Sequence, residues 1–149
     1  MKWDEYFMHL AEEVAQKSKD SSTKCGAIIV DPQQAIISTG YNGFPRLVND
    51  DIKSRYERPE KYQWTEHAER NAIYNAARRG VPTEGCTIYI TGPSCTDCTR
   101  AIIQTGILCV VMKSKFGKGE HWEGDFAISQ KMFSEAGVLV IYYDEAESG

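Results

Sequence analysis

The sequence predicts an α/β domain in which helices surround a mixed five-stranded sheet. Short runs rich in β-branched residues alternate with helical patterns in the order α-β-β-α-β-α-β-α-β. The chain has 149 residues, the length of one domain, and can bury a core without disulfides. Its content of 42% hydrophobic and 26% charged residues is typical of globular proteins and excludes disordered and fibrous classes. We therefore expect a single domain over residues 1–149.

The charge balance and the cysteine content limit which partners and which cellular compartment we expect. Lys and Arg number 17 against 21 Asp and Glu, a net charge of −4, which argues against nucleic acid as the partner. No run approaches the ~18 apolar residues of a membrane span, and the acidic residues within the first apolar pattern exclude a signal peptide. Five cysteines are an odd number and too few for a disulfide framework. We expect a cytoplasmic protein without a membrane partner.

The first element is an amphipathic helix over residues 3–17. Apolar side chains recur at Trp3, Phe7 and Leu10, the spacing of one helical face, which predicts that this stripe lies in the core. The polar run 18–24 ends the helix. Two β-rich runs, 25–30 and 35–39, then flank the turn signal Asp31-Pro32 and predict a hairpin of strands.

A glycine-rich loop and a long irregular segment follow the hairpin. Residues 40–45, GYNGFP, have the turn chemistry of a loop that leaves a strand. Residues 46–64 have mixed charge, three aromatic residues and no clean period, so we predict a loop with a helical turn. Loops of this length inside a domain are usually functional.

The second half alternates helices and strands. The predicted elements are a helix that starts at Thr65-Glu66 and is stopped by Gly80 and Pro82, a strand at 87–91, a helix at about 96–105, a strand at 107–112, a helix at 126–135 and a strand at 138–143. Residues 114–119 form a glycine-lysine loop, and the tail from 144 is solvated.

Two short motifs carry the chemistry. His67-Ala68-Glu69 and, further on, Cys95-Thr96-Asp97-Cys98 both lie near predicted helix starts. Alone, the first could be structural, and the second could be a thiol redox pair or half of a structural zinc site. Together they supply one imidazole, two thiolates and one free carboxylate. A closed structural site usually needs a fourth protein ligand, so the set favours a hydrolytic zinc site.

Each residue type in this set has a chemical task. Three protein ligands hold zinc and leave the fourth position for water, whose pKa falls to about 7. Helix N-termini favour ionised Cys95 and Cys98, and the Glu69 carboxylate then moves protons. Because residues two apart on a helix point to different sides, His67 and Glu69 can share a pocket only within the first turn.

The chain resembles the zinc-dependent cytidine and deoxycytidylate deaminase superfamily, and most closely its dCMP deaminase branch. The H-x-E and C-x-x-C pair is the signature of zinc nucleobase deaminases. GYNGFP followed by the acidic pair Asp50-Asp51 points to the dCMP branch. The matching segments are KCGAIIV (24–30), STGYNGFP (38–45), HAERNAI (67–73), GCTIY (85–89), CTDC (95–98) and AIIQTGI (101–107).

The resemblance implies a three-layer α/β/α sandwich and hydrolysis of dCMP to dUMP with release of ammonia. It implies one Zn²⁺ per chain on His67, Cys95 and Cys98, with Glu69 as the proton shuttle at C4, N3 and the leaving amine. It also implies that Asn42 contacts the sugar and that the backbone N–H of Ala68 donates to the pyrimidine carbonyl. Homo-oligomers, from dimer to hexamer, are usual in this superfamily.

Two departures from the family pattern stand out. Ser94, not Pro, precedes the first thiolate, which could re-aim the carbonyls around the amino group. The loop holds the candidate allosteric nucleotide residues Gly43, Pro45 and Asp50, but Leu47 stands where a second Gly is usual. A β-carbon restricts the positive-φ conformations that Gly permits, which counts against regulation by dCTP and dTTP.

Several further residues are candidates around the pocket. The substrate phosphate needs donors, for which Lys24, Arg46 and Arg70 are the main candidates, with Arg55 and Arg58 nearby in sequence. Arg70 could instead pair with an acid of a neighbouring subunit. The remaining candidates are Trp64 and Trp122 for stacking on the base, His121 for approach to the pocket, and Cys25 for its lining.

Three alternatives remain open at this point. The same fold could act on another substrate, namely dCTP, a free nucleoside, guanine or tRNA adenosine. A non-catalytic zinc- and nucleotide-binding module is the second alternative, and the intact Glu69 argues against it. The third is a thiol redox protein that uses Cys95 and Cys98.

Overall fold

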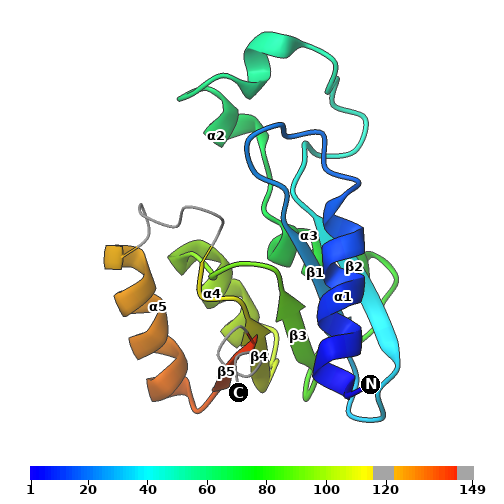
Figure 1. Cartoon of the computed structure of the whole chain (residues 1–149), viewed down its shortest axis with the longest axis vertical. Coiled ribbons are helices and arrows are strands. Elements are labelled where there is room, and N and C mark those ends of the chain that lie inside the picture. The colour runs from blue at the N-terminus through cyan, green and yellow to red at the C-terminus, as the bar shows by residue number, and fades with distance from the viewer. Residues whose placement is uncertain (116–122, 144–149) are drawn as a thin grey trace.

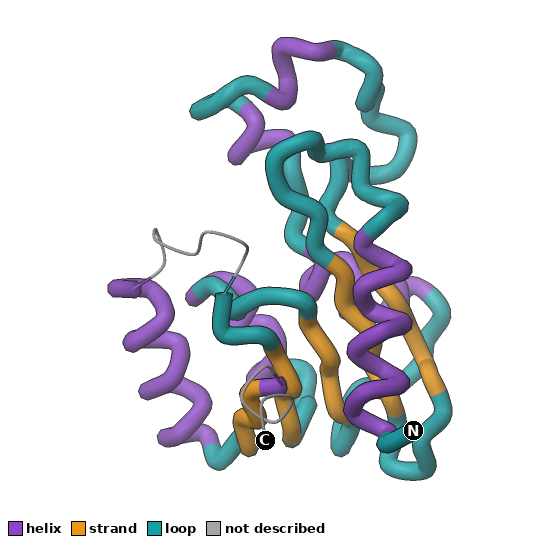
Figure 2. The backbone as a smooth tube through the Cα atoms, in the orientation of Figure 1, coloured by secondary structure: helices purple, strands orange, loops and turns teal. Residues whose placement is uncertain are grey.

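The computed structural model describes residues 1–115 and 123–143, which form a five-stranded sheet in the order β2-β1-β3-β4-β5 (Figures 1 and 2). β1 pairs antiparallel with both β2 and β3, whereas β3, β4 and β5 run parallel. The strands are β1 (Gly26–Val30), β2 (Ile36–Tyr41), β3 (Thr87–Ile90), β4 (Cys109–Met112) and β5 (Leu139–Tyr142). The helices are α1 (Trp3–Ala15), α2 (Lys61–Trp64), α3 (Ala68–Arg78), α4 (Thr96–Gln104) and α5 (Glu123–Ala136), with a 3-10 helix η1 (Lys53–Tyr56).

Helices cover both faces of the sheet, which confirms the predicted three-layer α/β fold (Figure 1). Alternate residues of β1 point to opposite faces: Ala27 and Ile29 pack with α3, α4 and α5, and Ile28 and Val30 pack with α1. All five residues of β1 are buried, because the strand lies inside the sheet with both faces covered.

Two glycines allow helices to approach the sheet closely. A Cβ on Gly26 would lie 2.0 Å from the Ala11 carbonyl oxygen of α1. A Cβ on Gly40 would lie 2.3 Å from the Ala72 nitrogen and 2.4 Å from the Ala68 oxygen of α3. Only a residue without a side chain fits at either position. The contact at Gly40 sets the distance between α3 and β2.

The segment 46–64 stands at one end of the sheet, with η1 and α2 at the top of Figure 1. It has its own small aromatic cluster, in which Phe44 stacks on Tyr56 at 4.7 Å and on Trp64 at 6.0 Å between ring centroids. Arg55 lies 3.9 Å above the Trp64 ring, a cation–π contact. The predicted helical turn is present, and the rest of the segment is held by side-chain contacts.

Several predicted boundaries were wrong. The helix expected from Thr65-Glu66 begins at Ala68, because Thr65 ends α2 and Glu66 pairs with Gly43 in an isolated antiparallel bridge. The second strand runs 36–41 and not 35–39, the strand expected from 107 begins at 109, and the last helix begins at 123.

The expected core stripe of the first helix was also partly wrong. Phe7 is buried, but Trp3 is 55% exposed and Leu10 is only partly buried. The buried face of α1 consists of Phe7, Met8, Ala11 and Ala15. The helix is rotated relative to the prediction because the small Ala11 and Ala15 side chains let it approach Gly26.

The expected roles of His121 and Trp122, most of the loop 114–119 and the tail from 144 lie outside the described residues. Among the helices that the structure describes, none has both the length and the apolar character needed to cross a bilayer.

Candidate active site

The two motifs meet where the N-termini of α3 and α4 lie side by side. His67 and Cys95 are the N-cap residues of these helices and have extended backbones, with φ, ψ of −77°, 153° and −73°, 170°. Glu69 and Cys98 lie in the first turns that follow. Because His67 precedes the helix, its side chain can point into the same pocket as that of Glu69.

Three donor atoms converge at this point. His67 Nδ1 lies 3.3 Å from Cys95 Sγ and 3.4 Å from Cys98 Sγ, and all three donors lie within 4.8 Å of one another. Zn–S bonds of ~2.3 Å and Zn–N bonds of ~2.05 Å give a tetrahedron with an N···S edge of about 3.6 Å. One imidazole and two thiols at this spacing therefore fit zinc and leave a fourth position for water.

The electrostatics of the two thiols are coupled. The pKa of Cys95 is lowered to about 4, first by the hydrogen bond from the Cys98 thiol and then by His67. The pKa of Cys98 is raised first by its hydrogen bond to Cys95 and then by burial. The two sulfurs alone thus share one negative charge, and a divalent cation between them would allow both to ionise.

Glu69 is the free carboxyl group of the site. It is 3% exposed, and burial raises the pKa of its carboxyl group, while His67 and a hydrogen bond with Cys98 oppose that rise. The described His67, Cys95 and Cys98 form the donor cluster without it. A buried carboxyl group beside a metal site is suited to accept and return a proton.

Polar contacts join the two motifs to each other and to the glycine-rich loop. The Glu66 N–H donates to the Gly43 carbonyl at 2.8 Å, and the Gly43 N–H donates back at 3.1 Å. Arg70 donates from Nε to Glu66 at 2.6 Å and lies 3.6 Å from Asp97 of the C-x-x-C motif. Arg70 therefore pairs with acids of its own chain. The sequence analysis had left open a pairing with an acid of a neighbouring subunit.

Asn42 is 7% exposed and is held by backbone groups on both sides. Its Oδ1 accepts from the Cys25 N–H at 2.8 Å, and its Nδ2 donates to the Thr23 carbonyl at 2.8 Å. An amide has two donor hydrogens and two lone pairs, so one of each is left for a ligand. Ala68 is fully buried, and its N–H belongs to the first turn of α3, where the helix supplies no acceptor.

The phosphate candidates differ in how far their charge is neutralised. Arg70 lies between two carboxylates, so its charge is largely compensated. Lys24 is exposed and donates to the neutral Ser18 carbonyl at 2.6 Å, and Arg46 is exposed and donates to the neutral Asn75 amide oxygen at 2.6 Å. Lys24 and Arg46 thus keep more of their charge for an anion.

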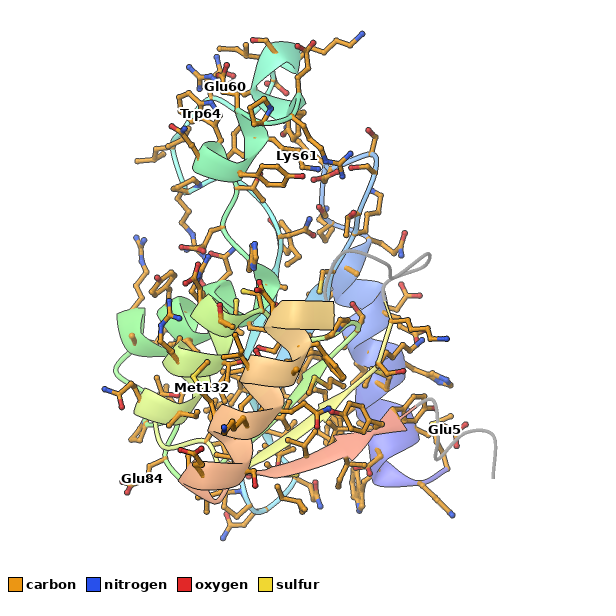
Figure 3. All side chains as sticks on the ribbon, turned by 90° about the vertical axis from the view of Figure 1, so that its left-hand side faces the viewer. Glu5, Glu60, Lys61, Trp64, Glu84 and Met132 are labelled. Atoms are coloured by element: carbon orange, nitrogen blue, oxygen red, sulfur yellow. The ribbon has the colours of Figure 1, made fainter. Side chains whose placement is uncertain are left out.

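The other residues proposed to line the pocket already have partners within the chain or are buried. Arg55 donates to the Asn49 carbonyl and stacks on Trp64, and Arg58 donates to the Tyr62 hydroxyl. Trp64 donates from Nε1 to Glu60 at 2.8 Å and lies with Lys61 on the segment above the sheet (Figure 3). Cys25 is buried, and burial raises the pKa of its thiol.

The two departures from the family pattern have simple structural outcomes. Ser94 is 2% exposed, and its hydroxyl lies 3.0 Å from that of Thr99 in α4. Leu47 has a φ of 71° and a fully exposed side chain, so the loop adopts a left-handed residue there despite the β-carbon. The steric argument against the regulatory loop, drawn from the sequence, was therefore wrong.

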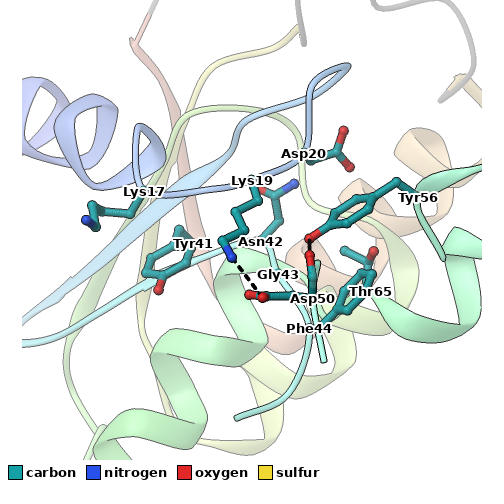
Figure 4. A pocket seen from close by; sticks show the side chains of 10 residues that line it. All are labelled: Lys17, Lys19, Asp20, Tyr41, Asn42, Gly43, Phe44, Asp50, Tyr56 and Thr65. Atoms are coloured by element: carbon teal, nitrogen blue, oxygen red, sulfur yellow. Dashed lines mark hydrogen bonds and ion pairs between the residues drawn. The ribbon is translucent and has the colours of Figure 1, made fainter. Parts of the chain in front are cut away.

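A cavity of about 90 Å³ lies beside the glycine-rich loop (Figure 4). Lys19 bridges Asp50 and Asp51 at its edge, with distances of 2.8 and 3.1 Å. The Tyr56 hydroxyl donates to the Asp50 carbonyl at 2.7 Å. Its wall is formed by Lys17, Lys19, Asp20, Tyr41, Asn42, Gly43, Phe44, Asp50, Tyr56 and Thr65.

The sequence analysis missed the residues that hold the site in place. Gly40 lies against α3, and the sequence analysis placed it in a loop because the predicted strand ended at residue 39. Asp20 and Lys61 form a buried ion pair at 3.0 Å. Asp20 lies within SKDSST, a pattern typical of a side chain that accepts from its own turn, but no local signal identifies Lys61 as its partner.

The fold and the donor set define the class as an α/β/α enzyme with a three-ligand metal site and a separate buried carboxyl group. Comparison with known proteins agrees with this class. Residues 1–114 match the family model of the cytidine and deoxycytidylate deaminase zinc-binding region. The chain belongs to the cytidine and deoxycytidylate deaminase family.

Similar proteins cover almost the whole chain. An uncharacterised deaminase encoded in the luxG 3′ region of Aliivibrio fischeri is 42% identical over 95% of this chain and 93% of its own. The human deoxycytidylate deaminase is 35% identical over 93% of this chain and 78% of its own. The structure of a dCMP deaminase from cyanophage S-TIM5 in complex with dCMP and dUMP superposes with a TM-score of 0.77, at 25% identity, over 95% and 98% of the two chains.

Proposed function

We propose that this chain catalyses the hydrolysis of dCMP to dUMP and ammonia. The observation that carries this proposal is the convergence of His67, Cys95 and Cys98 within 4.8 Å, with buried Glu69 in the adjoining helical turn. The likeness to deoxycytidylate deaminases extends over more than nine tenths of the chain and selects dCMP among the substrates of this fold.

His67, Cys95 and Cys98 would hold one zinc ion. When bound, zinc supplies a Lewis acid that makes water available as a nucleophile at neutral pH. Glu69 takes one proton from the attacking water and delivers it to N3 of cytosine. It then transfers the second proton of that water from the oxygen at C4 to the amino group, which leaves as ammonia. Its burial suits this task, because a raised carboxyl pKa lies closer to the working pH.

The remaining residues bind and orient the nucleotide. The Ala68 N–H donates to the pyrimidine carbonyl from the positive end of α3. Asn42 uses its free N–H hydrogen and lone pair for the sugar hydroxyl. Lys24 and Arg46 bind the phosphate, whereas Arg70 acts mainly by joining Glu66 to Asp97.

The test is ammonia release by the zinc-loaded protein with dCMP, dCTP, deoxycytidine and guanine side by side. We expect turnover of dCMP and its loss in Glu69→Ala with the zinc content unchanged. Turnover of another substrate in place of dCMP would overturn the substrate assignment. A Glu69→Ala protein with full activity would overturn the proton-transfer role.

Four further expectations belong to the same proposal. The chain forms one domain over 1–149, works as a homo-oligomer, and resides in the cytoplasm, for which its five unpaired cysteines are the support. The loop with Gly43, Pro45 and Asp50 binds a regulatory nucleotide. Light scattering of the purified protein tests the oligomer, and dCMP turnover with added dCTP and dTTP tests the regulation.

A further inference from the structure

The ion pair between Lys61 and Asp20 is unusual because both partners are buried. Lys61 Nζ lies 3.0 Å from Asp20 Oδ2 and 3.0 Å from the Ser22 hydroxyl, and the paired side chains are 7% and 8% exposed. The pair joins α2 to the segment after α1, far away in sequence. Because buried ion pairs contribute little net stability, we infer the role of this pair from the groups that it holds in place.

Asp20 organises the turn that follows it. Its second oxygen, Oδ1, accepts from the Ser22 N–H at 2.9 Å, the Ser22 hydroxyl at 2.9 Å and the Thr23 N–H at 3.1 Å. Lys61 fixes the other oxygen, so the carboxylate cannot rotate. The position of the Thr23 backbone therefore depends on the ion pair.

Thr23 in turn contacts Asn42 directly. The Thr23 carbonyl accepts from Asn42 Nδ2 at 2.8 Å. Ser18, from the same segment, donates its hydroxyl to the Asn42 carbonyl at 2.8 Å. The loop that Lys61 holds in place thus contacts both the side chain and the backbone of Asn42.

The backbone of Lys61 is connected to the start of α3, the helix that carries Glu69. The Thr65 N–H donates to the Lys61 carbonyl at 3.0 Å, and Glu66 then pairs with Gly43 next to Asn42. The contacts form a closed ring from Lys61 through Asp20 to Asn42 and back through Glu66.

We propose that Lys61 and Asp20 are positioning residues that orient the Asn42 amide for the nucleotide sugar, an inference that rests on the proposed function. Lys61→Met then leaves Asp20 unpaired and lets the Thr23 carbonyl turn. Asn42 loses its fixed orientation while the metal donors on α3 and α4 stay in place. We expect KM for dCMP to rise about tenfold, with kcat within about twofold of wild type, the result of losing one oriented hydrogen bond.

The control is Lys53→Met, which removes the same charge from an exposed position of η1 in the same segment. We expect it to match wild type, and Lys61→Arg to restore most of the KM. A rise in KM of equal size in both methionine variants, or a loss of kcat and zinc without a change in KM, would overturn the proposal. If Lys61→Met does not fold, Asp20→Asn/Lys61→Met removes both charges and is measured in the same way.

A double-mutant cycle tests the route through Asn42. If Lys61 acts through this amide, Lys61→Met adds less than about twofold to KM in an Asn42→Ala background, whereas independent effects would multiply. The side-chain amide signal of Asn42 in an NMR spectrum of the zinc-loaded protein should shift in Lys61→Met and not in Lys53→Met. The NMR measurement needs no substrate, so an unchanged Asn42 signal in Lys61→Met would count against this inference and not against the proposed function. Absence of dCMP turnover in the wild type counts against the proposed function alone.

Discussion

Gly40→Ala is expected to inactivate the enzyme from a position outside the active site. The new Cβ would lie 2.3 Å from the Ala72 nitrogen and 2.4 Å from the Ala68 oxygen, both backbone atoms of α3. Ordinary contact begins near 3.4 Å, so α3 must retreat by the difference between 3.4 and 2.3 Å, which is 1.1 Å. Glu69 lies in the first turn of the same helix and would move with it.

The magnitude follows from this displacement. A misplacement of about 1 Å costs roughly 100-fold in rate, close to 2.7 kcal/mol of transition-state stabilisation. Overpacking of a closely packed contact adds a loss of folding stability of about 1–3 kcal/mol. We therefore expect kcat/KM for dCMP to fall about 100-fold and the melting temperature to fall by several degrees.

The matched control is Gly80→Ala at the other end of α3. Gly80 has a φ of 69° and no atom within 4 Å of an added Cβ, so this variant loses about 1–2 kcal/mol through backbone strain alone. It should be destabilised like Gly40→Ala but keep its kcat/KM. A Gly40→Ala protein that retains more than half of the wild-type kcat/KM would refute the reasoning about the distance between α3 and β2.

Three further predictions concern the metal, the C-x-x-C turn and pH. Removal of metal by a chelator should abolish dCMP turnover, and zinc alone should restore it with one equivalent bound per chain by elemental analysis; full activity without metal would contradict the site. Ser94→Ala should lower the free energy of unfolding in urea by about 1–2 kcal/mol, because it leaves the buried Thr99 hydroxyl without this partner. Burial alone would raise the pKa of Asp20, but hydrogen bonds from Lys61 and Ser22 outweigh it and hold that pKa below the ordinary 3.8. Asp20 therefore stabilises the fold above pH 3.8 and loses that contribution as the pH falls through its lower folded pKa, so Asp20→Asn should flatten the acid side of a stability–pH curve, and an unchanged slope would contradict the pairing.

Local patterns were sufficient for the order of elements. Apolar runs and glycine or proline stops report on each segment by itself, and the resulting order is the one observed apart from the short helices η1 and α2 within the segment 46–64. Boundaries failed where a long-range contact decided them: α3 begins at Ala68 and not at Thr65, because the bridge between Glu66 and Gly43 keeps the preceding residues extended. Trp3 was misplaced for a similar reason, since the close approach of α1 to Gly26 sets which helix face is buried.

The donor types of the site were readable in the sequence, because zinc chemistry restricts them to a few residues at characteristic spacings. What holds those donors was not readable. The Lys61–Asp20 pair and the contact of Gly40 with α3 join segments distant in the chain, and nothing local marks a buried lysine or a closely approached glycine. The sequence by itself determined the chemistry and the class of fold, whereas only the tertiary structure decided how the pocket is held, because that depends on packing between distant segments.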